Sequence, residues 1–295
     1  MTLAFPNLSF DPIDVPDGPI RLGSPEHMRL FCRTLLTTFN PYKPAVIDWP
    51  KLEPKTQEII TSLPIWDMAV QTENRAGLFV ASFAEVVHDP LLQRAIELDG
   101  FEERRHRHVL SNLVQAYGIK LAPEPVVPKP KDPEWAFVRV GYSECIDSFF
   151  AFGLFEAAKR TGFFPPELVD TFEPIIHEEG RHILFFVNWI AWYRKNMAWW
   201  RRPWFELKVI AIWACLILER IGMASSLDQG VQDSNFTVNG AEQLGVELSP
   251  AELMNLCLTE NDRRLGVYDS RLLRPTFIPS MVRLVRRFLP SPRKP

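Results

Sequence analysis

The chain contains the pentapeptide Glu-Glu-x-Arg-His twice, as Glu102-Glu103-Arg104-Arg105-His106 and as Glu178-Glu179-Gly180-Arg181-His182. Each copy holds a Glu-x-x-His pair, Glu103 with His106 and Glu179 with His182. Residues three apart share one face of an α-helix, so each pair presents a carboxylate and an imidazole in the same direction. The repeat therefore predicts two helices that carry equivalent sets of metal ligands.

One further acidic residue precedes each pentapeptide, within an apolar helical stripe. Glu73 shares its face with Val70 and Val80, and Glu144 shares its face with Phe137. A buried carboxylate is costly unless it is neutralised or paired with positive charge. Four inward glutamates and two imidazoles therefore predict two divalent cations inside a four-helix bundle. The predicted metal ligands are Glu73, Glu103, His106, Glu144, Glu179 and His182.

The distances of these residues from the expected turns support the pairing. The first hairpin turns near residue 89, so Glu73 lies 16 residues before the turn and Glu103 lies 14 after it. The second turns near residue 164, with Glu144 20 residues before it and Glu179 15 after it. Antiparallel helices therefore place each pair at similar depth, with a looser match of about 7 Å in the second pair.

Asp147 would match the second turn better, at 17 residues before it. We prefer Glu144 because small and apolar residues flank it on its helical face. Asp147, together with Asp99 one turn before Glu103, is then expected to hydrogen-bond a ligand histidine.

The helical pattern predicts an all-α fold built on a four-helix bundle. We expect bundle helices at 65–88, 90–117, 134–160 and 167–198. Residues 119–133 contain five prolines. Extended at about 3.1 Å per residue, such a segment reaches about 45 Å, enough to run the length of a bundle. This crossover lets the second and third helices lie parallel.

Additional helices are expected on both sides of the bundle. We divide the chain into an N-terminal arm (1–64), the bundle (65–198) and a C-terminal helical cap (199–295), which together form one continuous domain. The extra helices are expected at about 25–39, 53–62, 204–223, 249–267 and 278–289.

Composition restricts the function. A net charge of −3 gives no reason to expect a nucleic-acid partner. The longest apolar run, Val209 to Leu218, has 10 residues, whereas a transmembrane helix needs about 20. The four cysteines are isolated in sequence and no signal peptide is visible, which favours a reducing, cytoplasmic location.

The ligand pattern resembles that of the ferritin-like di-iron carboxylate superfamily over residues 65–198. The resemblance implies two iron ions, or a manganese–iron pair, with Glu103 and Glu179 as bridging and catalytic ligands. The aryl-amine N-oxygenases of this superfamily carry a third histidine where this chain has Ile175, so that branch is disfavoured. His177 points about 200° away from Glu179 and is not expected to be a ligand.

The resemblance implies an oxygenase or oxidase that uses O2 to hydroxylate, desaturate or oxidise a hydrophobic small molecule, with an electron-donor protein or reductase as partner. Tryptophans after the bundle would form a cap that excludes water. Small residues such as Gly77 and Gly141 would leave room for a substrate. Two alternatives remain open: a ferroxidase or iron-handling protein, and a non-catalytic helical binding module whose acids pair with Arg104, Arg105 or Arg181.

The C-terminal segment from Met281 to Lys294 is a short basic amphipathic helix with a basic tail. It could rest on an acidic membrane surface or a redox partner, or dock on the protein by its apolar face. The oligomeric state, including a homodimer, is left open.

Overall fold

The computed structural model describes residues 12–63, 65–162, 164–226 and 249–288. All regular structure in these ranges is helical, and none of it is β-strand. The all-α prediction is therefore confirmed. Residues 1–11, Phe163 and the basic tail with Arg293 and Lys294 lie outside the described residues.

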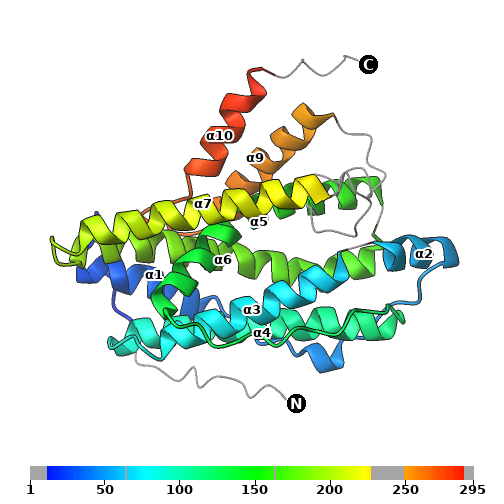
Figure 1. Cartoon of the computed structure of the whole chain (residues 1–295), viewed down its shortest axis with the longest axis horizontal. Helices are drawn as coiled ribbons and strands as arrows, with labels where there is room; N and C mark the ends of the chain where they lie inside the picture. The colour runs from blue at the N-terminus through cyan, green and yellow to red at the C-terminus, as the bar shows by residue number, and fades with distance from the viewer. Residues whose placement is uncertain (1–11, 64, 163, 227–248, 289–295) are drawn as a thin grey trace.

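Four long helices form the bundle and lie side by side (Figure 1). They are α3 (Trp66–Ala84), α4 (Pro90–Ala116), α5 (Pro133–Thr161) and α6 (Pro166–Asn196). The starts of α4 and α5 have the same cause, an aspartate cap followed by proline. The Asp89 carboxylate accepts from the amides of Leu91 and Leu92, and the Asp132 carboxylate accepts from the amide of Trp135.

The Pro-rich segment between α4 and α5 crosses the bundle as expected. The Ala122 amide donates to Asp67 in the first turn of α3, at 2.7 Å. Lys129 pairs with Glu85 at the other end of α3. The segment thus runs along α3 from its start to its end, and α4 and α5 point in the same direction.

The outer helices pack on this bundle (Figure 1). They are α1 (Pro25–Thr37), the short 3-10 helix η1 (Pro44–Val46), α2 (Pro54–Ser62), α7 (Arg202–Ser226), α9 (Pro250–Gly266) and α10 (Phe277–Arg286). α1 lies against α6, where Phe31 meets Phe185 edge to face. α9 approaches α5 closely at Gly153, where the missing side chain leaves room for Cys257. A Cβ at this position would come within 2.4 Å of the Cys257 sulfur. The bundle is therefore enclosed on several sides.

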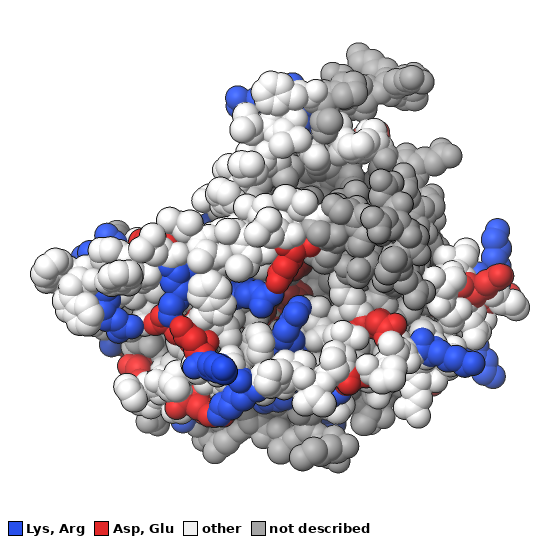
Figure 2. Space-filling view, in the orientation of Figure 1, with Lys and Arg blue, Asp and Glu red and all other residues white. Residues whose placement is uncertain are grey.

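Charged side chains of both signs are mixed on the face of the molecule seen in Figure 2, not gathered into a single patch. Among the described residues, no helix combines the length and apolarity needed to cross a bilayer. α10 buries Val282 but leaves Leu284 and Val285 exposed, so its apolar residues are only partly docked.

Candidate metal centre

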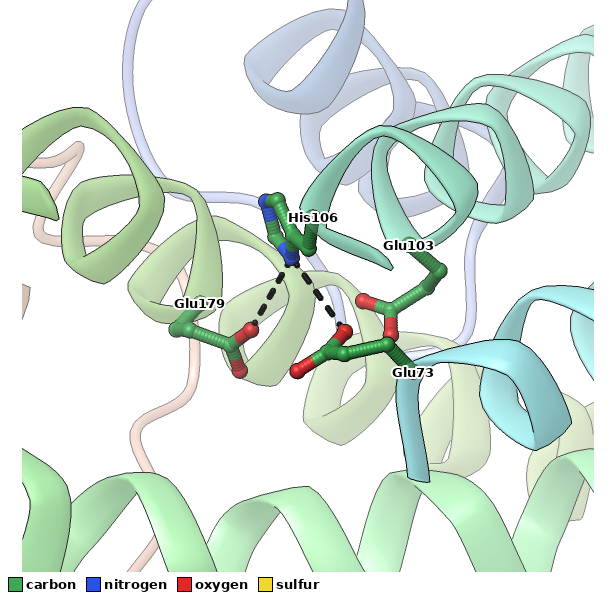
Figure 3. Close-up of side chains that lie close together, drawn as sticks. All are labelled: Glu73, Glu103, His106 and Glu179. Carbon is green, nitrogen blue, oxygen red and sulfur yellow. Dashed lines mark ion pairs between the residues drawn. The ribbon is translucent and has the colours of Figure 1, made fainter. Parts of the chain in front are cut away.

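All four bundle helices contribute predicted ligands. Glu73 lies on α3, Glu103 and His106 on α4, Glu144 on α5, and Glu179 and His182 on α6. Figure 3 shows four of these side chains converging from α3, α4 and α6 on one region between the helices. The imidazoles of His106 and His182 are fully buried. The amphipathic pattern therefore turns these side chains toward the interior of the bundle.

One cluster surrounds Nδ1 of His106. This nitrogen lies 3.6 Å from Oε2 of Glu73 and 3.3 Å from Oε1 of Glu179. Glu103 joins them, and one ligand atom of each of the four residues lies within 4.8 Å of the others. Two atoms that each bind one ion at about 2.1 Å are about 3 to 4 Å apart. The two measured separations from Nδ1 fit a single shared cation.

A second cluster surrounds Nδ1 of His182. This nitrogen lies 2.8 Å from Oε1 of Glu103 and 3.8 Å from Oδ1 of Asp99. Glu103 belongs to both clusters, so its carboxylate can reach two cations. Glu179, the other residue for which the resemblance implies bridging, belongs to the His106 cluster alone.

Glu144 lies beside the second cluster without belonging to it. Its Oε1 atom is buried and has no hydrogen-bond partner. Burial, with the charges of Glu103 and Asp99 next in importance, raises the pKa of Glu144 well above its usual value. One turn further along α5, the Ser148 hydroxyl donates to Oε2 of Glu179 at 2.9 Å. Ser148 thus orients a ligand carboxylate.

The first glutamate of each pentapeptide holds the histidine of the other copy. Oε2 of Glu178 lies 2.8 Å from Nε2 of His106, and Oε2 of Glu102 lies 2.8 Å from Nε2 of His182. An imidazole that donates from Nε2 carries its free lone pair on Nδ1. Each histidine therefore turns Nδ1 toward its carboxylate cluster.

The arginine of each pentapeptide holds the glutamate of the other copy. Arg105 donates to Glu178 at 2.5 Å, and Arg181 donates to Glu102 at 2.8 Å. Both guanidinium groups are buried and also bind the outer segments. Arg105 donates to the carbonyl of Asn40, and Arg181 donates to the carbonyl of Leu35 in α1. The two copies of the pentapeptide are therefore cross-linked to each other and to the N-terminal arm.

Sequence reasoning missed this cross-link. It used only the Glu-x-x-His part of the motif, although the first glutamate and the arginine are repeated as well. The expected partner Asp147 is wrong, because Asp147 lies at the surface, where it binds Ser143 and Arg220. Among the described residues, Arg105 and Arg181 form ion pairs with Glu102 and Glu178 and with none of the predicted ligand glutamates.

No protein-family model matches the chain, and no curated protein sequence matches it significantly. Solved structures do match. One is a variant of an R2-like ligand-binding oxidase with an aerobically reconstituted Mn/Fe cofactor, at TM-score 0.51 and 17% identity, covering 82% of this chain and 94% of the other. Another R2-like ligand-binding oxidase variant, with an anaerobically reconstituted Mn/Fe cofactor, also gives TM-score 0.51 and 17% identity, covering 86% and 99%. The chain has a ferritin-like fold. At this identity the similarity shows the fold, and the chemistry must be argued from the site.

The ferritin-like bundle concentrates polar atoms that lack partners at its centre. These buried atoms, none of which has a hydrogen-bond partner, are Oε2 of Glu73, Oδ1 of Asp99, Oε1 of Glu103, Nδ1 of His106, Oε1 of Glu144 and Nδ1 of His182. Buried polar atoms are almost always paired in folded proteins. Cations at the two clusters would satisfy these atoms, so the residues fit a dinuclear metal site.

The pKa values show the same demand for positive charge. Burial, followed by the charge of Glu73, raises the pKa of Glu103 to about 8. Burial raises the pKa of Asp99 to about 6. Burial lowers the pKa of His106, but its carboxylate neighbours outweigh that effect and hold the value well above the usual one. Without a metal, protons supply the positive charge that the carboxylates require.

Three of the tryptophans expected to form a cap do not cover the metal centre, whereas Trp192 and Trp213 pack against the core. Trp199, Trp200 and Trp204 are 81%, 60% and 72% exposed. α6 continues 14 residues from His182 to Asn196, about 21 Å at 1.5 Å per residue, so it carries these rings beyond the centre.

Two of the small residues expected to leave room for a substrate, Gly77 and Gly141, face neighbouring side chains instead. A Cβ at Gly77 would lie 2.8 Å from Cγ of Arg104, and one at Gly141 would lie 2.1 Å from the Phe186 ring. These glycines allow close packing between helices. His177 hydrogen-bonds Tyr268 at 3.1 Å and belongs to neither cluster.

Proposed function

We propose that this ferritin-like protein is an oxidoreductase that uses a di-iron or manganese–iron pair to activate O2 and oxidise a hydrophobic small molecule. The observation that carries the proposal is the set of buried carboxylate and imidazole atoms without hydrogen-bond partners, which come from all four bundle helices. Two clusters of them, around Nδ1 of His106 and Nδ1 of His182, could each hold a metal ion. Carboxylate-rich sites with two histidines suit iron or manganese better than softer metals.

The residues of the chain have separate roles in this proposal. Glu73, Glu103, His106, Glu144, Glu179 and His182 would hold the two ions. Once bound, such a pair supplies electrons to O2 and the oxidising power for the substrate. Glu102 and Glu178 keep the Nε2 protons of the histidines, which leaves Nδ1 free for metal. Burial of both imidazoles excludes water from these two ligand positions.

Glu73 and Glu179 are more accessible than Glu103, the carboxylate that both clusters share. The side chains of Glu73 and Glu179 are 21% and 14% exposed, whereas that of Glu103 is 3% exposed. We therefore place the approach of O2 and substrate on the side of Glu73 and Glu179. The Mn/Fe cofactors named for the similar solved structures support the choice of metals. The proposal also requires an electron donor, for which we expect a reductase.

The test is O2 consumption by metal-reconstituted protein. The protein is loaded anaerobically with two equivalents of Fe(II), or one each of Mn(II) and Fe(II), and then mixed with O2. We expect the amount of O2 consumed to be proportional to the amount of protein and to stop rising at about two metal ions per chain. Glu103→Ala should lose both the O2 consumption and the metal binding. The exposed α4 residue Glu97, changed to Gln, is the control.

Excess Fe(II) separates the proposal from iron handling. A ferroxidase continues to oxidise iron well beyond two equivalents per chain, whereas the proposed enzyme stops there unless an external reductant and a substrate are supplied. Metal binding without any O2 consumption would exclude both activities.

A further inference from the structure

We propose that Asp99 is a seventh protein ligand of the metal centre, bound to the ion beside His182. This inference rests on the dinuclear centre proposed above. It assigns to Asp99 direct contact with metal, in place of the hydrogen bond to a ligand histidine that its sequence position suggests.

The position of Asp99 fits coordination. It lies on α4 one turn before Glu103 and therefore on the same helical face. Its Oδ1 atom is 3.8 Å from Nδ1 of His182, and Oε1 of Glu103 is 2.8 Å from the same nitrogen. Atoms that share an ion at about 2.1 Å are separated by about 3 to 4 Å. The two distances lie close to that interval.

Among the described residues, Asp99 has one ion-pair contact, the long one to His182 at 3.8 Å. The residue is 3% exposed, and its Oδ1 atom has no hydrogen-bond partner. Within the described part of the chain, no arginine or lysine forms an ion pair with it. A buried carboxylate without such a partner is strongly unfavourable. Nδ1 of His182 and Oε1 of Glu103 are also without hydrogen bonds, so three such atoms face one another.

The role of hydrogen-bond acceptor for His182 is already taken. Glu102 occupies the Nε2 side of the ring at 2.8 Å, and Arg181 fixes that glutamate. Asp99 approaches the opposite nitrogen, Nδ1, which is the one available to metal. The geometry therefore favours Asp99 as a ligand over Asp99 as a support for the ring.

Asp99 also breaks the two-fold repeat. The second pentapeptide has the apolar Ile175 at the corresponding position, four residues before Glu179. Only the ion beside His182 would gain the extra carboxylate, so the two ions would be chemically different. With Asp99 the centre would have five carboxylates, and their negative charge would exceed the positive charge of two divalent ions by one unit. This excess negative charge would favour oxidation of the ions.

The test compares Asp99→Asn and Asp99→Leu with the wild type and with Glu97→Gln, an exposed acid two residues earlier on α4. Two readouts are used: metal per chain after equilibrium with buffered Mn(II) or Fe(II), and the Mössbauer spectrum of the 57Fe-loaded protein. We expect the dissociation constant of the more weakly bound of the two ions to rise at least about tenfold in both Asp99 variants. We also expect one of two unlike iron signals to change, while Glu97→Gln matches the wild type.

Unchanged dissociation constants and spectra in both variants, with two ions bound by the wild type, would overturn the Asp99 assignment alone. Failure of the wild type to bind two ions would overturn the proposed metal centre and this inference together. If the variants do not fold, a crystal structure of the wild type with Mn(II) decides. An Asp99 oxygen within about 2.3 Å of an anomalous peak supports the assignment, and one beyond about 3 Å overturns it.

Discussion

Replacement of Glu178 by glutamine tests whether the crossed pentapeptides position the metal ligands. The Glu178 carboxylate accepts from Arg105 at 2.5 Å, from Nε2 of His106 at 2.8 Å and from the Tyr42 hydroxyl at 3.2 Å. Glutamine keeps the size of the side chain but has one acceptor oxygen and no charge. Its amide nitrogen would face either the guanidinium or the imidazole N–H, donor against donor.

The expected magnitudes follow from those contacts. Loss of the hydrogen bond that orients a ligand histidine typically costs 10- to 100-fold in metal affinity, or about 1.4 to 2.7 kcal/mol. Removing one partner of a buried ion pair costs about 3 to 5 kcal/mol, and we expect Glu178→Gln near the lower end because one oxygen still accepts. Arg105 would then lose the charge of its nearest carboxylate and keep only the longer ion pair to Glu102, at 3.6 Å.

The assays are equilibrium dialysis against buffered Mn(II) and urea unfolding of the metal-free protein. Glu102→Gln is the symmetric counterpart and should lower the affinity for the ion beside His182 by a similar factor. The exposed Glu167, changed to Gln on the same helix α6, is the control. Wild-type affinity together with wild-type stability in Glu178→Gln would refute the reasoning, because the crossed contacts would then have no energetic role.

Two further predictions concern pH and packing. Because the pKa of Glu103 is raised from 4.5 to about 8, the folded metal-free protein retains a proton that the unfolded chain has lost between those values. The melting temperature of the metal-free protein should therefore fall from pH 6 to pH 8, and Mn(II) should raise it more at pH 8 than at pH 6. Differential scanning fluorimetry measures both effects. An equal rise on adding Mn(II) at both pH values would contradict the coupling of this proton to metal binding. Gly141→Ala should lower the free energy of unfolding by about 1 to 3 kcal/mol, since its Cβ would lie 2.1 Å from the buried Phe186 ring. Gly180→Ala is the matched control, because its Cβ would meet only ordinary contacts, the nearest being Leu265 at 3.5 Å. This change should be neutral or should stabilise the protein by up to about 1 kcal/mol. Equal losses of unfolding free energy in the two variants, measured by urea unfolding, would count against the packing argument.

The helices and the bundle followed from local signals. Asp89-Pro90 marked the start of α4, and the Pro-rich crossover predicted that α4 and α5 are parallel. These features depend on residues close in sequence, where capping and φ restriction act. The inward positions of the ligand residues followed from the helical period in the same way.

The contacts between helices far apart in sequence were not predictable to the same degree. Asp147 lies on nearly the same stripe as Glu144, but α7 covers that edge and Arg220 binds it. The position of α7 depends on tertiary packing that one sequence does not reveal. The roles of Glu102 and Arg181 could have been found, because the repeat preserves both positions and a repeated polar residue on a buried helix requires a partner.

Crystallographic anomalous scattering at the iron and manganese edges tests the central claim most directly. Our account predicts two anomalous peaks per chain, about 3.5 to 4 Å apart, one bound by Nδ1 of His106 and the other by Nδ1 of His182. Both should be bridged by Glu103. A single peak, or metal bound at Nε2 with Glu102 and Glu178 displaced, would contradict the account.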